Sequence, residues 1–109
     1  MGIVNATPQD VVIYDDDGNV VKTYPRSGMV ASVAVTSKVV DNVNGVDVAE
    51  PSFGGVVGIP EPSDGTIYIV PLMVVTHVSR SDLIGPDTGT DSVVRDDHGR
   101  ILGVKRFTR

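Results

Sequence analysis

The stretch VVIYDDDGNVVKTY, residues 11–24, indicates the fold class. Two runs of β-branched and aromatic residues flank a polar turn, and Gly18 stands where a tight turn needs a positive φ. This pattern predicts a β-hairpin. Asn44-Gly45, the dipeptide preferred in type I′ turns, predicts a second hairpin between residues 39–43 and 46–48.

A third hairpin is predicted over residues 92–107, and its pattern repeats that of the first. At 12–20 and again at 93–101, a Val, an apolar residue and one further residue precede Asp-Asp-X-Gly-X and a β-branched residue. An internal duplication and shared turn chemistry both explain the repeat. We favour shared chemistry, because Asp and Gly recur in turns for local reasons.

The composition supports a β-rich domain. The chain has 22 Val, 7 Ile and 8 Thr but only 3 Leu, and 12 Gly and 7 Pro interrupt it. Because β-branched residues fit strands better than helices, a helical bundle is disfavoured. We expect a single domain over residues 1–109, all-β or mainly β with one short helix near residues 71–79, arranged as a small antiparallel barrel or sandwich of about seven short strands. Over residues 71–79, Pro71 suits a helix start and Val74-Val75-Thr76 favours a strand.

Residues 29–36 predict a central strand. Met29, Ala31, Val33 and Val35 alternate with residues that are also apolar or small, so both faces look covered. A chain of this length can hardly fill two such faces. The pattern therefore points to a small barrel, or to a subunit that completes its packing with another copy. The Gly-rich residues 53–59 are interpreted as a bulged or tightly packed strand.

The charge is unevenly distributed. The net charge is −5, yet residues 95–109 carry five basic and two acidic side chains. These basic residues either guard a sheet edge or bind an anion or the acidic surface of a neighbouring subunit. They are too few for duplex nucleic acid. No apolar run reaches the ~20 residues of a membrane span, and the first residues lack a secretory pattern, so we expect a cytoplasmic or virion protein.

Metal sites and cofactors are not expected. The chain has no Cys. The acidic run Asp15–Asp17 lacks the closing Glu of a calcium loop, because Tyr24 stands at that position. His77 and His98 have no zinc-like spacing to other ligands.

An enzyme is not expected either. Ser27, His77 and Asp82 supply the residue types of a hydrolase but lie in no nucleophile-elbow motif. A small hydrolase stays as an alternative.

The candidate ligand-binding residues are polar groups that suit a planar or phosphorylated molecule. They are Tyr68, Arg80, Asp82, Arg95 and Arg100. In the alternative, structural interpretation, Arg80 and Asp82 cap the end of the preceding element and pair with Arg95.

Several segments, taken in order, resemble a family of small uncharacterised proteins encoded by tailed phages, prophages and bacterial genomes. They are Asn5-Ala6-Thr7-Pro8, Pro25-Arg26-Ser27-Gly28-Met29-Val30-Ala31, Gly58-Ile59-Pro60-Glu61-Pro62, Gly65-Thr66-Ile67-Tyr68-Ile69-Val70, Arg80-Ser81-Asp82-Leu83, residues 87–96 and residues 99–104. Ala6 and Arg26 depart from the family pattern, which has Leu and Pro there. The resemblance covers most of the chain and implies a phage or mobile-element origin, but no activity.

Three hypotheses for function follow. The first is a phage-encoded, non-enzymatic, homo-oligomeric binding protein that acts in the host cytoplasm on a host protein or a small anionic, nucleotide-like ligand. The second is a virion accessory or capsid-decoration protein that contacts other virion proteins. The third is the small hydrolase. Homo-oligomers are expected because pairing between copies removes exposed strand edges.

Overall fold

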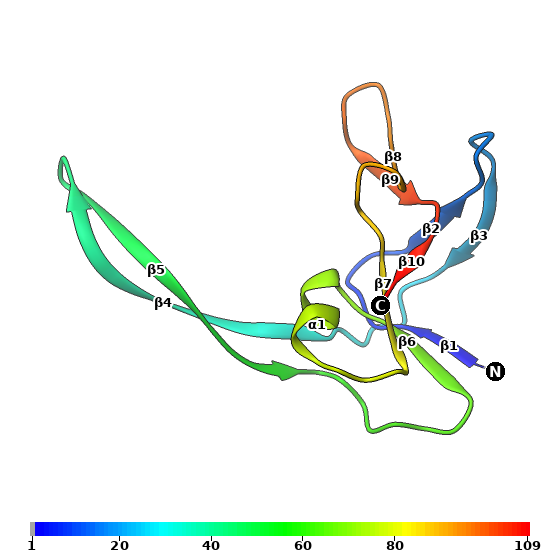
Figure 1. Cartoon of the computed structure of the whole chain (residues 1–109), viewed down its shortest axis with the longest axis horizontal. Coiled ribbons are helices and arrows are strands. Elements are labelled where there is room, and N and C mark those ends of the chain that lie inside the picture. Colours follow the sequence, from blue (N-terminus) through cyan, green and yellow to red (C-terminus); the bar gives the residue numbers. More distant parts are fainter. Residues whose placement is uncertain (1) are drawn as a thin grey trace.

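The computed structural model describes residues 2–109, which form ten strands and one short helix (Figure 1). The expected mainly-β fold with one short helix is confirmed. The helix, α1 (Leu72–His77), begins after Pro71, whose fixed φ suits a helix start. It ends at His77, and the next residue, Val78, has an extended backbone.

The first sheet has the order β1-β6-β7-β10. Its strands are β1 (Gly2–Asn5), β6 (Thr66–Ile69), β7 (Leu83–Pro86) and β10 (Phe107–Thr108). The core lies between this sheet and α1: Ile69, Val70, Val74 and Leu83 are fully buried. Residues 72–77 form a helix rather than a strand, and the one buried residue of this helix, Val74, belongs to that core.

The second sheet has the order β3-β2-β9-β8 and contains both Asp-rich hairpins. Its strands are β2 (Val11–Tyr14), β3 (Val20–Tyr24), β8 (Val93–Arg95) and β9 (Ile101–Val104). The hairpins predicted over residues 11–24 and 92–107 are therefore confirmed. Val11 and Val104, on the two central strands, are its buried apolar residues.

The predicted arrangement of these strands is wrong in two respects. The sheets within residues 2–109 do not close into a barrel, and the two four-stranded sheets are mixed rather than antiparallel. The pairs β1–β6, β6–β7 and β2–β9 are parallel. These pairs join segments that are not connected by a tight turn, so no turn motif in the sequence predicts them.

The two Asp-rich turns have the same hydrogen bonds. Asp15 Oδ1 accepts from the backbone N–H groups of Asp17 and Asn19, and Asp96 Oδ1 accepts from those of His98 and Arg100, at 2.8–2.9 Å. Gly18 and Gly99 have φ of 83° and 79°. The repeated sequence pattern therefore corresponds to one turn geometry that occurs twice.

The remaining strands, β4 (Ser32–Val43) and β5 (Val46–Val57), form a two-stranded hairpin that projects from the body and is called the arm (Figure 1). Asn44 and Gly45 have φ of 53° and 86°, which confirms the predicted type I′ turn. A register shift opposite Gly54 and Gly55 confirms the predicted bulge.

The prediction of a covered central strand at residues 29–36 is wrong. Ala31 is buried, but Val30 and Val35 are 45% and 54% exposed, because the strand leaves the body after Val33 and pairs only with β5. The alternation of small and apolar residues is the same in a covered strand and in the base of a projecting arm. The sequence pattern does not distinguish them.

Candidate functional site

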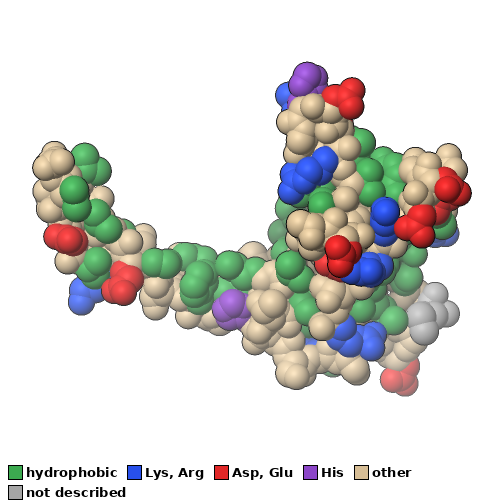
Figure 2. Space-filling view, turned by 45° about the horizontal axis from the view of Figure 1, so that its top comes forward, with side chains coloured by type: hydrophobic (Ala, Val, Ile, Leu, Met, Phe, Trp, Pro, Cys, Tyr) green, Lys and Arg blue, Asp and Glu red, His purple; other side chains and the backbone are tan. Residues whose placement is uncertain are grey.

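The arm carries the largest set of exposed apolar side chains in the described part of the chain. Every residue from 34 through 55 is exposed. Hydrophobic side chains follow the arm along its length (Figure 2). The valines of the arm that are exposed by half or more are Val35, Val39, Val40, Val43, Val46 and Val57.

One face of the arm is an apolar stripe that begins in the core. Opposite residues share a face of a hairpin, and the register gives the apolar pairs Val33–Val56, Val35–Phe53 and Val39–Ala49, with Ser37–Pro51 between the last two. The first pair packs against the core. Phe53 lies beside α1, with its ring 5.6 Å from that of His77. The stripe continues outward to the third pair without cover from the described residues.

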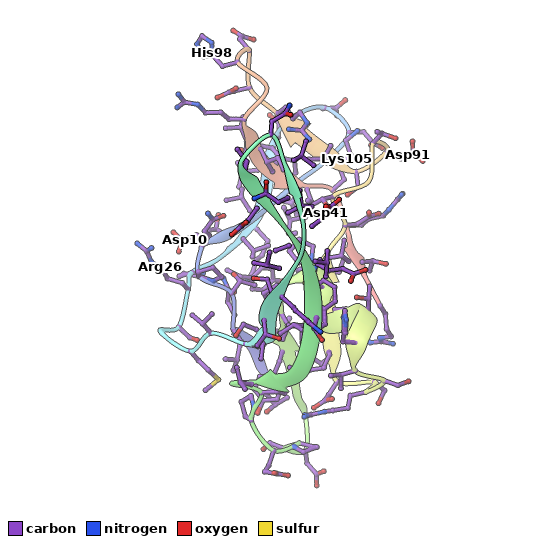
Figure 3. All side chains as sticks on the ribbon, turned by 90° about the vertical axis from the view of Figure 1, so that its left-hand side faces the viewer. Asp10, Arg26, Asp41, Asp91, His98 and Lys105 are labelled. Atoms are coloured by element: carbon purple, nitrogen blue, oxygen red, sulfur yellow. The ribbon has the colours of Figure 1, made fainter. Side chains whose placement is uncertain are left out.

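The tip of the arm is a second apolar feature. Val43 and Val46 stand opposite each other across the two-residue turn and are 53% and 68% exposed. Two carboxylates adjoin this pair. Asp47 accepts a hydrogen bond from Asn42 Nδ2 at 3.0 Å, and Asp41 accepts one from the Asn42 backbone N–H. Figure 3 shows Asp41 on the arm, where it extends toward the viewer.

An apolar groove lies on the body, between β9 and the start of α1. It has a volume of about 350 Å³. The loop at residues 7–10, the first residues of β2, Leu72, Pro86 and residues 101–104 line it. Leu72, Ile101 and Leu102 are 38–51% exposed there. Such a groove suits an apolar side chain from another molecule.

The candidate ligand-binding residues do not form one site. Arg80 binds Asp82 through two hydrogen bonds, Nε–Oδ1 at 2.9 Å and Nη2–Oδ2 at 2.6 Å, and donates a third to the Pro60 carbonyl at 3.1 Å. Tyr68 is buried on β6, and its backbone N–H donates to the Asp82 carbonyl. These three residues hold the loop before β6 against β7.

The other two candidates lie on the β8–β9 hairpin, in the other sheet. Arg95 donates to the Gly99 carbonyl at 2.7 Å and therefore stays within its own turn. Arg100 follows that turn and is exposed. Figure 3 shows this hairpin projecting from the body, with His98 near its tip. The structural interpretation predicts that Arg80 and Asp82 cap the preceding element and pair with Arg95. They pair instead with each other, Arg80 bonds the Pro60 carbonyl, and Arg95 bonds within its own turn.

The Arg80–Asp82 pair has the electrostatics of a structural ion pair. Hydrogen bonding to Arg80 lowers the pKa of Asp82, and desolvation opposes that effect. Hydrogen bonding to Asp82 raises the pKa of Arg80. Both side chains are about a fifth to a quarter exposed. The guanidinium already has three acceptors, which leaves it little capacity for an anionic ligand.

Sequence reasoning missed a buried polar network around Asn5. The Asn5 side chain donates to the carbonyls of Gln9 and Tyr24 at 2.9 and 2.8 Å and accepts from Thr7. The Ser27 hydroxyl donates to the Asn5 carbonyl at 2.7 Å. The family-like segments at residues 5–8 and 25–31 thus meet at the base of the arm, and their polar residues hold the loops together.

The hydrolase alternative gains no support from this geometry. The Ser27 hydroxyl is engaged by Asn5, whereas the His77 ring bonds the Met73 carbonyl at 2.8 Å on α1. Ser27 and His77 make no hydrogen bond with each other. Within residues 2–109, no group of three or more His, Cys, Asp or Glu is placed to hold a metal ion. No helix in that range is long and apolar enough to cross a membrane.

Comparison of the chain with protein-family models, with curated proteins and with solved structures finds no match.

Proposed function

We propose that this chain is a non-enzymatic binding protein that works as a subunit of an assembly, with the arm as its binding element. The observation that carries the proposal is the exposure of every residue from 34 through 55 on two strands of 12 residues each. The apolar stripe on this arm continues the core outward, so a protein surface that covers it would extend the core across an interface.

The energetics of the arm support a partner. An isolated two-stranded hairpin is marginally stable in water, and packing against further structure stabilises it. Only the base of the arm has such packing, at Val33 and Val56. Covering the exposed valines would remove apolar surface from water at about 25 cal/mol per Å². The arm therefore gains order when it binds.

The accessible surface of the chain is large enough to include an interface with a partner protein. The accessible surface is 7201 Å², against about 5,800 Å² for a compact chain of 11.5 kDa. The radius of gyration is 16.7 Å, against about 13 Å for a compact domain of this length. The excess of about 1,400 Å² exceeds the ~800 Å² that each partner contributes to a typical stable interface.

Among the hypotheses from sequence, the arm favours a structural subunit such as a virion accessory protein. A projecting apolar hairpin suits permanent contact with a neighbouring subunit, and the resemblance to phage and prophage proteins agrees with a role in a particle. A small anionic ligand has less support, because Arg80 is engaged by Asp82 and because Arg95 and Arg100 belong to another sheet. Mass spectrometry of purified particles separates a virion protein from one that stays in the host cytoplasm.

Site-specific photo-crosslinking in the producing cell tests the proposal. A photoreactive residue at Val40 on the arm is compared with one at Val21 on β3, because both side chains are at least half exposed. We expect a defined adduct from position 40 and little from position 21. Equal adduct yields at positions 40 and 21, or no adduct at position 40, would contradict the proposal that the arm is the binding element. The mass of the adduct shows whether the neighbour is a second copy.

A further inference from the structure

The groove beside β9 and the tip of the arm have complementary properties. The groove is lined by Leu72, Ile101 and Leu102, whose side chains are partly exposed to solvent. The tip presents Val43 and Val46 at the narrow end of a hairpin, where only the two-residue turn lies beyond them. A groove of about 350 Å³ can receive such a tip. Both surfaces would lose apolar exposure in that contact.

The arm tip is acidic, and a basic residue stands beside the groove. The arm carries Lys38 against Asp41, Asp47 and Glu50, and two of these carboxylates adjoin the tip. Arg100 immediately precedes the groove residue Ile101. The groove lining also includes Asp10, whose carboxylate accepts a hydrogen bond from the Arg26 backbone N–H. Opposite charges around an apolar contact favour one docking partner and one orientation over others.

Arg100 is a basic residue available for this contact. Lys105 Nζ lies 3.3 Å from Asp16, and Arg106 Nε lies 2.7 Å from Asp87. Among residues 2–109, the Arg100 side chain has no ion-pair partner; its backbone N–H and carbonyl both bond to Asp96. An arm that brings Asp41 and Asp47 to the groove would supply that partner.

The arm that fills this groove belongs to a different molecule. In Figure 1 the arm leaves the body beside α1 and extends away from β9. The molecule spans 50 Å along its longest axis, with the arm as its main projection in that direction. A rigid hairpin with this direction reaches a neighbour and not its own groove.

We propose that the arm tip of one copy docks in the groove of the next copy. This inference rests on the proposed function and names its partner, a second copy of this chain. The contact is head-to-tail, because each copy contributes an arm to one neighbour and a groove to another. Such contacts generate closed rings, or open chains where the rotation does not close.

Complementation between two defective variants tests the inference. The arm variant is Val43→Thr with Val46→Thr, and the groove variant is Ile101→Thr with Leu102→Thr. All four positions lie in strands and are about half exposed or more, so threonine keeps the strand preference while it removes apolar surface. Circular dichroism checks that both variants are folded. The control is Val20→Thr with Val21→Thr, on β3 and outside both surfaces.

Sedimentation velocity gives the readout. We expect oligomers from the wild type and from the control, monomers from each variant alone, and dimers from their equimolar mixture. The mixture stops at dimers because it contains one intact arm and one intact groove per pair. A groove variant that self-associates as the wild type does would overturn the inference, since arms alone would then suffice. A monomeric wild-type chain would also overturn it.

A charge variant gives a test that does not touch the apolar lining. Arg100→Glu should weaken self-association by at least tenfold, whereas the same charge change at Lys22→Glu, on exposed β3, should leave it within about twofold. Equal effects at the two positions would contradict the assignment of Arg100. Failure of the head-to-tail contact is distinguishable from failure of the proposed function. In the first case Val40 still crosslinks to a neighbour; in the second it does not.

Discussion

The guanidinium of Arg80 and the carboxylate of Asp82 are joined by two parallel hydrogen bonds of 2.9 and 2.6 Å across the start of β7. The same guanidinium donates to the Pro60 carbonyl, so the pair connects the loop before β6 to the core sheet. A pair used in this way contributes to stability rather than to ligand capture.

Asp82→Asn should lower the free energy of unfolding by about 1–2 kcal/mol at neutral pH, because the half-buried guanidinium loses its anionic partner. Asp97→Asn, at an exposed turn position, is the control. Since Arg80 lowers the pKa of Asp82 in the folded chain, this stabilisation is complete above the ordinary carboxyl pKa of ~3.9 and disappears as the pH falls below it. Urea unfolding over a pH series measures the difference, and a constant difference throughout the acid range would contradict this role.

Asn5→Ala should destabilise the chain by about 2–3 kcal/mol, because it removes the acceptor of the Thr7 backbone N–H and the side-chain donor to the Tyr24 carbonyl. Gln9→Ala should have little effect, since only the backbone of that residue takes part in these bonds. Thermal unfolding of the two variants provides the comparison. Equal midpoints would show that the network is dispensable.

Asp15→Ala and Asp96→Ala should each lower stability by about 0.5–1.5 kcal/mol, because each carboxylate accepts two backbone N–H groups of its turn. The neighbouring Asp97→Ala should be neutral. Amide exchange in each hairpin should increase only where its own Asp is replaced. Similar effects from Asp97 and Asp96 would mean that the net charge of the turn, not its geometry, is responsible.

Gly103→Ala should destabilise the chain by about 2–3 kcal/mol, since a Cβ at this position would overlap the Val12 carbonyl and the Tyr14 ring. Gly55→Ala, in the bulge of the arm, has open space and should be neutral or slightly stabilising. Chemical denaturation of both variants is the measurement. A Gly103→Ala variant as stable as Gly55→Ala would contradict the close packing of β2 against Gly103.

Local sequence patterns predict the elements of this fold well. Asn44-Gly45 and the two Asp-rich turns specify hairpins because the turn conformation is encoded within a few residues. The parallel pairs of β1, β6 and β7 join segments about 60 and 15 residues apart, and no turn specifies them. Pairing over such distances is decided by the packing of the whole chain.

The candidate site is predicted in part. Arg80 and Asp82 are two residues apart, so their contact follows from local geometry, whereas the distance of Arg95 from them depends on which sheet β8 joins. The arm is the feature that sequence reasoning missed. Its valines fit a covered strand in one chain or an interface between chains, and both bury the same side chains. The expectation of packing with another copy follows from that ambiguity.

Hydrogen exchange of the arm at increasing chain concentration tests the central claim most directly. If the arm packs on a second copy, the amides of residues 34–55 become more protected as concentration rises, while those of β3, which lies outside the arm and the groove, do not change. Protection of the arm that is independent of concentration would show that the hairpin is stable alone and would contradict its role as an interface between copies.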